Sequence, residues 1–170
     1  MNIAATLQRA LPSIEKNGNF IRDAWDRLRV VPGGSRIFSR MVGMAAPYTG
    51  SIGARVVELR QGFARVELSD RRQVRNHLDC VHAIALANLA ELTGNVAVAY
   101  SLPEDARFIV KGMSLDYLKK ARGTITGTAS CPAFDDARER EVEIEVCLHD
   151  ASGAEVTRAI LRTLIGPKRG

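Results

Sequence analysis

Glu91 is an acidic residue in a segment that is otherwise almost entirely apolar. It lies near the end of the run from Val81 to Leu92, whose apolar residues fall on nearly every side of a helix. Such a pattern predicts a buried helix rather than an amphipathic surface helix. A buried carboxylate is costly unless it is paired, hydrogen-bonded or protonated. Glu91 is therefore a candidate general base or nucleophile.

His82 and Asn76 precede Glu91 by nine and fifteen residues and complete the candidate site. Nine helical residues rise roughly 13–14 Å and turn through about 180°, so His82 and Glu91 of one chain cannot touch the same reacting atom. The start of the helix offers free N–H groups, which can hold a carbonyl oxygen that becomes an oxyanion. If both ends serve one site, two chains must contribute across a two-fold axis, which predicts a homodimer.

The surrounding elements are predicted from hydrophobic periodicity. Residues 1–45 carry three apolar stripes at helical spacing, at 3–11, 20–28 and 37–42. Alternation then predicts a hairpin of Ile52–Leu59 and Phe63–Leu68 before the buried helix, which Gly94 is expected to end. The strands expected after it are Val96–Leu102, Phe108–Leu118, Thr124–Cys131, Glu141–Leu148 and Glu155–Ile165.

One apolar helix among many antiparallel strands predicts an α+β fold in which the sheet curls around the helix. We expect a single domain at residues 46–170, preceded by an N-terminal helical extension at residues 1–45.

Composition narrows the class of protein further. The net charge of +5 is modest and no block of Lys and Arg is present, so we expect no nucleic-acid partner. Cys80, Cys131 and Cys147 have no disulfide or zinc spacing, which favours reduced thiols and a cytoplasmic location. No signal peptide or membrane span is expected. His77 and His82 are five residues apart, not four, so we expect no metal site. We also expect no cofactor.

The pattern Asn76-x5-His82-Ala83-x7-Glu91 resembles the signature of hotdog-fold acyl-CoA thioesterases, in particular the phenylacetate-pathway-like branch. The stretch from Leu115 to Gly123 is similar to that family's strand ending in an aromatic residue, a basic or proline pair, and Gly. The resemblance covers about residues 45–166.

The resemblance implies a hotdog fold, assembled as a dimer or a dimer of dimers, that hydrolyses acyl-CoA. Glu91 would be the catalytic carboxylate and the Ala83 N–H would contribute to the oxyanion hole, although the family usually has Gly at that position. His82 would lie at the thioester carbonyl, and Asn76 would orient water or the thioester. The basic residues that could meet the CoA phosphates, or could instead be solvated, are Lys119, Lys120 and Arg122, and also Arg71, Arg72 and Arg75.

Two other functions and one structural role stay open. Hotdog hydratases and dehydratases use a His and an acid about fourteen residues apart, as His77 and Glu91 are, but no Pro or Gly lies between His77 and Ala83. The second alternative is a non-catalytic acyl-CoA-binding module. Glu91 itself could be a structural acid paired with an Arg across the dimer.

Overall fold

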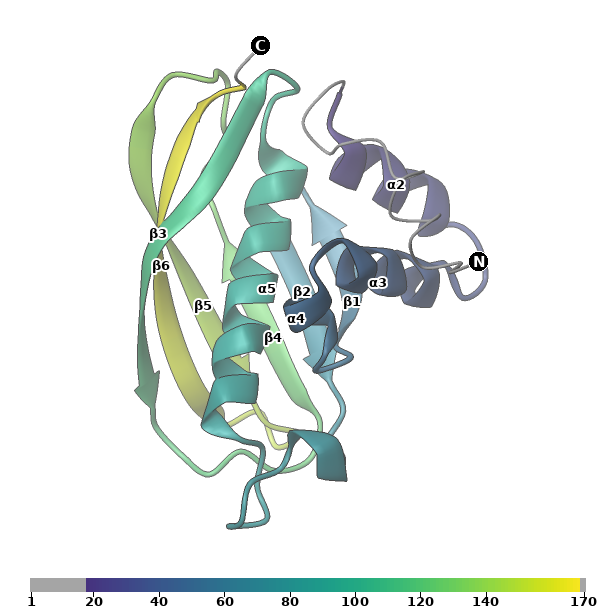
Figure 1. Ribbon diagram of the computed structural model, residues 1–170, viewed down its shortest axis with the longest axis vertical. Helices are drawn as coiled ribbons and strands as arrows, with labels where there is room; N and C mark the ends of the chain where they lie inside the picture. Colours follow the sequence, from purple (N-terminus) through teal and green to yellow (C-terminus); the bar gives the residue numbers. More distant parts are fainter. Residues whose placement is uncertain (1–17, 169–170) are drawn as a thin grey trace.

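The protein is described here by a computed structural model that covers residues 18–168 and contains one curled antiparallel sheet. The helices are α2 (Phe20–Leu28), α3 (Gly34–Ala45), α4 (Pro47–Gly50) and α5 (Ala83–Ser101), with a 3₁₀ turn at Arg72–Val74. The strands are β1 (Arg55–Arg60), β2 (Phe63–Leu68), β3 (Ala106–Tyr117), β4 (Ile125–Ser130), β5 (Arg140–His149) and β6 (Glu155–Pro167). All neighbouring strands pair antiparallel, in the order β1-β2-β4-β5-β6-β3 (Figure 1).

The sheet curls around α5, which contacts all six strands (Figure 1). This helix is long and apolar enough to cross a membrane, but 61% of its most apolar window is buried inside the protein, as expected of a core helix. The predicted α+β hotdog architecture is therefore confirmed. The outer strands β1 and β3 form the two edges of the sheet.

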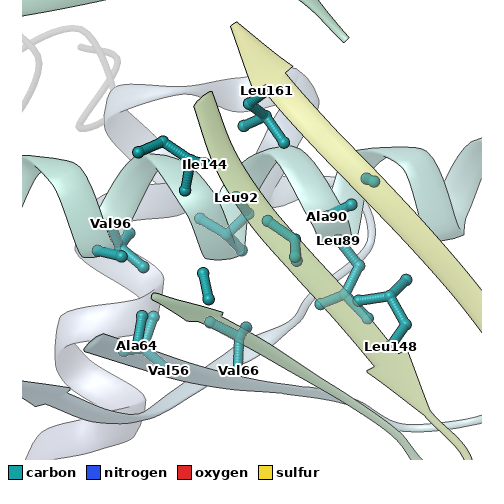
Figure 2. Close-up of a cluster of buried hydrophobic side chains, with 14 of the residues drawn as sticks. Val56, Ala64, Val66, Leu89, Ala90, Leu92, Val96, Ile144, Leu148 and Leu161 are labelled. Carbon is teal, nitrogen blue, oxygen red and sulfur yellow. The ribbon is translucent and has the colours of Figure 1, made fainter. Parts of the chain in front are cut away.

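The hydrophobic core lies between α5 and the concave face of the sheet (Figure 2). Leu89 and Ala90 of α5 are both fully buried, as are Ile144 and Leu148 of β5. Because apolar side chains of α5 meet sheet side chains along its whole length, burial of this helix contributes a large share of the apolar area removed from water.

Gly94 does not end the buried helix, so two predictions are wrong. The helix α5 continues to Ser101, and the segment predicted as the strand Val96–Leu102 is its last part. A Cβ atom at Gly94 would lie 2.7 Å from Leu161 Cδ2 and 3.3 Å from Val146 Cγ2. The glycine thus permits close packing of helix on sheet instead of stopping the helix, and four strands rather than five follow α5.

The N-terminal helices pack on β1 and on the end of α5. Trp25 meets Phe38 edge-on at 5.1 Å between ring centroids, and its indole N–H donates to the Leu59 carbonyl at 3.1 Å. Asn19 Nδ2 donates at 2.8 Å to the carbonyl of Ala99, in the last turn of α5. These contacts fix the extension to the sheet and occupy a helix end that would otherwise keep unpaired carbonyls. The stripes predicted at 20–28 and 37–42 are helical, and the stripe at 3–11 lies outside the described residues.

Replacement of Leu89 by alanine tests the importance of α5 burial. The side chain is completely buried, so we expect Leu89→Ala to lower the free energy of unfolding by about 2–5 kcal/mol. Chemical denaturation monitored by circular dichroism gives this value. Val30→Ala is the control, since Val30 is 72% exposed and should change stability by less than about 0.5 kcal/mol. Equal effects of the two substitutions would contradict the central role of α5.

Candidate active site

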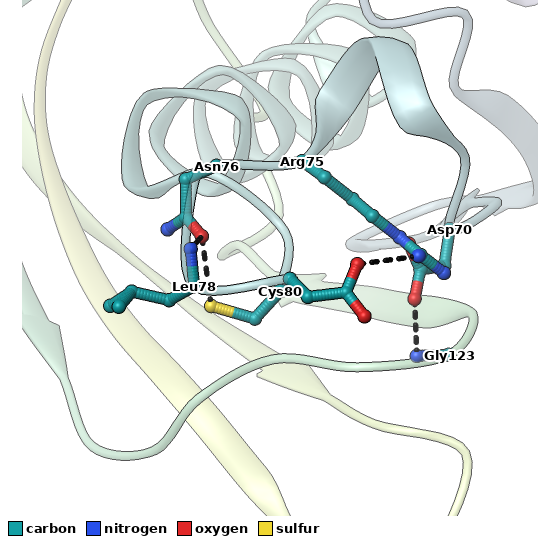
Figure 3. Close-up of polar contacts among 7 residues, drawn as sticks. Asp70, Arg75, Asn76, Leu78, Cys80 and Gly123 are labelled. Atoms are coloured by element: carbon teal, nitrogen blue, oxygen red, sulfur yellow. Dashed lines mark hydrogen bonds and ion pairs between the residues drawn. The ribbon is translucent and has the colours of Figure 1, made fainter.

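The segment that leads into α5 is fixed by ion pairs around Arg75. Its guanidinium lies 2.6 Å from Asp70 Oδ1 and 2.7 Å from Asp79 Oδ1. Asp70 Oδ2 also accepts the Gly123 amide at 2.9 Å, which joins this segment to the residues before β4 (Figure 3). The hydrogen bond from Arg75 is the main reason that the pKa of Asp70 lies below its usual value. Arg75 is thus engaged in holding the chain in place.

Asn76 shapes the turn that follows. Its Oδ1 accepts the Leu78 amide at 2.9 Å and lies 3.4 Å from Cys80 Sγ (Figure 3). Asp79 adopts a positive φ of 53°, as a tight turn requires. Within residues 18–168, the Nδ2 group of Asn76 has no acceptor, so the side chain keeps donor hydrogens for a bound molecule.

His82 is the N-cap of α5. Its Nδ1 accepts the Ile84 amide at 3.0 Å, and its own backbone N–H donates to the Val74 carbonyl at 2.8 Å. Because Nδ1 is an acceptor here, a neutral His82 ring carries its proton on Nε2. The ring therefore caps the helix through one nitrogen and can donate through the other.

Ala83 begins α5 and leaves a donor at the positive end of the helix. No residue in the described part of the chain accepts its N–H, while its carbonyl accepts the Tyr117 hydroxyl at 3.1 Å. An unpaired first-turn amide together with the helix dipole can stabilise a developing oxyanion. This is the chemistry that the sequence predicted for the start of the helix.

A pocket of about 360 Å³, which we call the entrance pocket, opens beside the first turn of α5. Its lining residues come from the entry segment, from α5 and from the chain after β3: Asn76, Cys80, Val81, Ala83, Leu86, Tyr117, Leu118, Lys119, Lys120 and Ala121. The structure thus brings four predicted site residues together: Asn76, Ala83, Lys119 and Lys120.

Other predicted residues lie outside this pocket. His77, His82 and Arg122 are exposed and do not line it. The Arg71 side chain donates to the Ile52 carbonyl at 2.6 Å, so, like Arg75, it is already engaged in contacts within the fold. The sequence interpretation did not identify Tyr117 as a pocket residue whose hydroxyl donates to the Ala83 carbonyl, although it placed an aromatic residue at the end of that strand.

Glu91 lies eight residues beyond Ala83 on α5, a rise of roughly 12 Å. It is half-buried on a stripe of α5 that also includes the exposed Ile84 and the half-buried Ala87 and Asn95. Within residues 18–168, Glu91 has no hydrogen-bond or ion-pair partner among the side chains. One chain therefore presents the carboxylate on an open stripe of the helix, away from the entrance pocket.

Asn88 is a buried polar residue that the sequence interpretation missed. It lies three residues before Glu91, is only 5% exposed, and donates from Nδ2 to the Tyr48 carbonyl at 3.2 Å. Its Oδ1 is buried and has no partner in the described part of the chain. The bond ties α4 to α5 beside Glu91. A second polar side chain in the same apolar run was the signal that could have identified it.

This chain is similar to several solved structures that have the same fold. The structure of genomics APC5556 is 34% identical over 87% of this chain and 99% of its own, with a TM-score of 0.76. The protein PA5026 from Pseudomonas aeruginosa, described as of unknown function and a probable thioesterase, is 22% identical over 81% and 97%, with a TM-score of 0.71. The thioesterase HI1161 from Haemophilus influenzae is 11% identical over 72% and 85%, with a TM-score of 0.64.

Among curated proteins, none matches the chain. The model of a protein family described as "Domain of unknown function (DUF4442)" matches residues 34–165, which include α3, the whole sheet up to the last part of β6, and α5. The solved structures confirm the hotdog fold that the Asn76–His82–Glu91 pattern implied. This chain therefore belongs to the DUF4442 family and has the hotdog fold of its structural neighbours.

Proposed function

We propose that this protein is an acyl-CoA thioesterase whose active sites are each built from two chains. The observation that carries the proposal is the entrance pocket, where the unpaired Ala83 amide lies with Asn76, Lys119 and Lys120. The structural neighbours PA5026 and HI1161, which bear thioesterase names, support the same reaction class.

The reaction would divide between the two ends of α5. The thioester carbonyl oxygen would accept the Ala83 N–H, which stabilises the negative charge that develops there. Glu91 of the partner subunit would remove a proton from the attacking water, or attack the carbonyl carbon itself. The carbon–sulfur bond then breaks and the thiolate takes up a proton that originates from water. In the second route water then hydrolyses the acyl–Glu91 anhydride, so in both routes water supplies the oxygen of the released acid.

The free edge of β3 supports the required dimer. This strand has 12 residues, β6 pairs with only one side of it, and Ile109 on it is 62% exposed. A long edge strand whose backbone N–H and C=O groups are free on one side can pair with another strand. A two-fold axis perpendicular to β3 would pair it antiparallel with its copy and would also run the two α5 helices antiparallel. The start of one α5 would then lie toward the middle of the other.

Lys119 and Lys120 would attract the phosphates of CoA. Both are exposed at the rim of the entrance pocket, and Arg122 follows them in the sequence. Basic side chains at a pocket mouth bind phosphate through charge-assisted hydrogen bonds. Arg72 is also exposed, and it has no side-chain partner within residues 18–168.

Substitution of Glu91 tests the catalytic carboxylate. Glu91→Gln keeps the shape of the side chain but removes its basicity, so we expect thiol release from acyl-CoA to fall by about 100-fold or more. The assay should use short, medium, long and aromatic acyl-CoAs, with detection of the free thiol. Binding, measured as a rise in melting temperature, should persist.

The matched control is Glu143→Gln, because Glu143 is exposed on β5 and no ion pair of it is found among residues 18–168. Its turnover should equal that of the wild type. Unchanged turnover in Glu91→Gln would remove Glu91 from the mechanism. Stabilisation of the wild type by acyl-CoA without any thiol release would instead favour the non-catalytic binding module.

The oxyanion donor can be removed without changing the helix. Proline is well tolerated at the first helical position, and His82 has φ −64° and ψ 140°, which suits a residue before proline. Ala83→Pro should therefore fold normally but lose the N–H, with kcat falling about 100- to 1000-fold.

Ala83→Gly keeps the N–H and restores the residue usual in the related family. It should keep kcat within a few-fold of the wild type. Steady-state kinetics and circular dichroism on both variants decide the matter, since equal activity of the proline and glycine variants would show that this amide plays no part.

A further inference from the structure

A second and larger hollow lies beside α3 and α4. It encloses about 820 Å³ between α3, α4 and the β1–β2 hairpin, and we call it the α3 hollow. Ligand sites for small molecules commonly have volumes of this order. The residues predicted for catalysis do not line it, and from α5 only Leu92 reaches it. The helices α3 and α4 lie on the β1 side of α5, away from β3, so the proposed dimer leaves the hollow open (Figure 1).

One face of α3 forms a wall of this hollow. The lining positions at helical spacing are Arg36, Ser39, Arg40, Gly43 and Met44. The residue types change along the helix, from basic at Arg36 and Arg40 to apolar at Met44. Pro47, the first residue of α4, is the next lining residue in the sequence and is also apolar. Arg36 and Met44 are eight residues apart, a distance of roughly 12 Å along the helix axis. The wall is therefore amphipathic along its length.

The basic residues that line the hollow outnumber the acidic ones, which favours the binding of an anion. Among residues 18–168, the only acidic lining residue is Glu67, and its Oε2 lies 2.6 Å from the guanidinium of Arg55. The side chains of Arg36 and Arg40 have no hydrogen-bond or ion-pair partner within residues 18–168. Two neighbouring guanidinium groups thus remain available for a carboxylate.

Part of the lining of the hollow is apolar. Val42, Met44 and Ala54 contribute accessible apolar surface, because Val42 and Ala54 are half-buried and Met44 is 41% exposed, whereas Val56 and Leu92 lie beneath them at 1% and 6% exposed. A Cβ atom at Gly50 would lie 2.6 Å from the carbonyl oxygen of Gly43, so α3 and α4 can meet this closely only without side chains there. This close contact fixes α4 against α3, and both helices line the hollow.

We propose that the α3 hollow binds a fatty carboxylate. Its carboxylate contacts Arg36 and Arg40, and its hydrocarbon chain lies along Val42, Met44 and Ala54. The ordered change from basic to apolar lining selects an amphiphile over a simple anion. This site does not depend on the proposed thioesterase reaction, because Glu91 and Ala83 do not line it.

Isothermal titration calorimetry with decanoate tests the proposal on the full chain, with decanol and acetate as comparison ligands. We expect one decanoate per chain and much weaker binding of both comparison ligands. Replacement of both arginines in Arg36→Gln/Arg40→Gln should weaken decanoate binding about tenfold or more. Met44→Glu, at a position that is 41% exposed, should weaken it as well without unfolding the protein.

Arg27→Gln is the control, since Arg27 is exposed on α2 and does not line the hollow. It should bind as the wild type does, and so should Glu91→Gln even if that variant has no thioesterase activity. Failure of decanoate to bind, or binding that the paired arginine substitution leaves unchanged, would overturn the proposal. So would decanoate binding that Ala83→Pro weakens, because that result locates the ligand at the entrance pocket.

Discussion

The burial of α5 is the constraint on which the rest of the structure depends. A nearly uniformly apolar helix must be covered, and the sheet meets this need by curling around it (Figure 1). The first turn of α5 at Ala83 and the stripe that carries Glu91 remain accessible. The two groups that could take part in a reaction, the Ala83 amide and the Glu91 carboxylate, lie at these places. The same packing that stabilises the fold therefore determines where a reaction can occur.

Much of the fold could be predicted because periodicity reports burial directly. The alternation in β2 and β5 and the apolar run of α5 gave elements of the correct type. Gly94 was misinterpreted because glycine both ends helices and permits close packing, and only the position of Leu161 distinguishes the two. The segment after it is rich in Val and Ala, whose periodicity does not separate a buried helix from a buried strand.

The candidate site was predictable to the extent that it depends on local spacing. Asn76 and Ala83 lie on one pocket, since both belong to the segment that enters α5. Lys119 and Lys120 were predicted only from similarity to a known motif. Their separation from Ala83 in the sequence does not say where they lie in the fold. Arg75 proved structural owing to Asp70 and Asp79, partners that only the folded chain identifies. The contact of Asn88 with α4 is likewise tertiary.

In the proposed mechanism, each active site takes Ala83 from one chain and Glu91 from another. Mixing the Glu91→Gln and Ala83→Pro chains, by co-expression or joint refolding, tests it most directly. In a heterodimer, one of the two sites would combine the intact Ala83 of one chain with the intact Glu91 of the other. Random pairing should then restore about a quarter of wild-type thiol release from two inactive parents. Activity no greater than that of the separate parents would contradict a shared site.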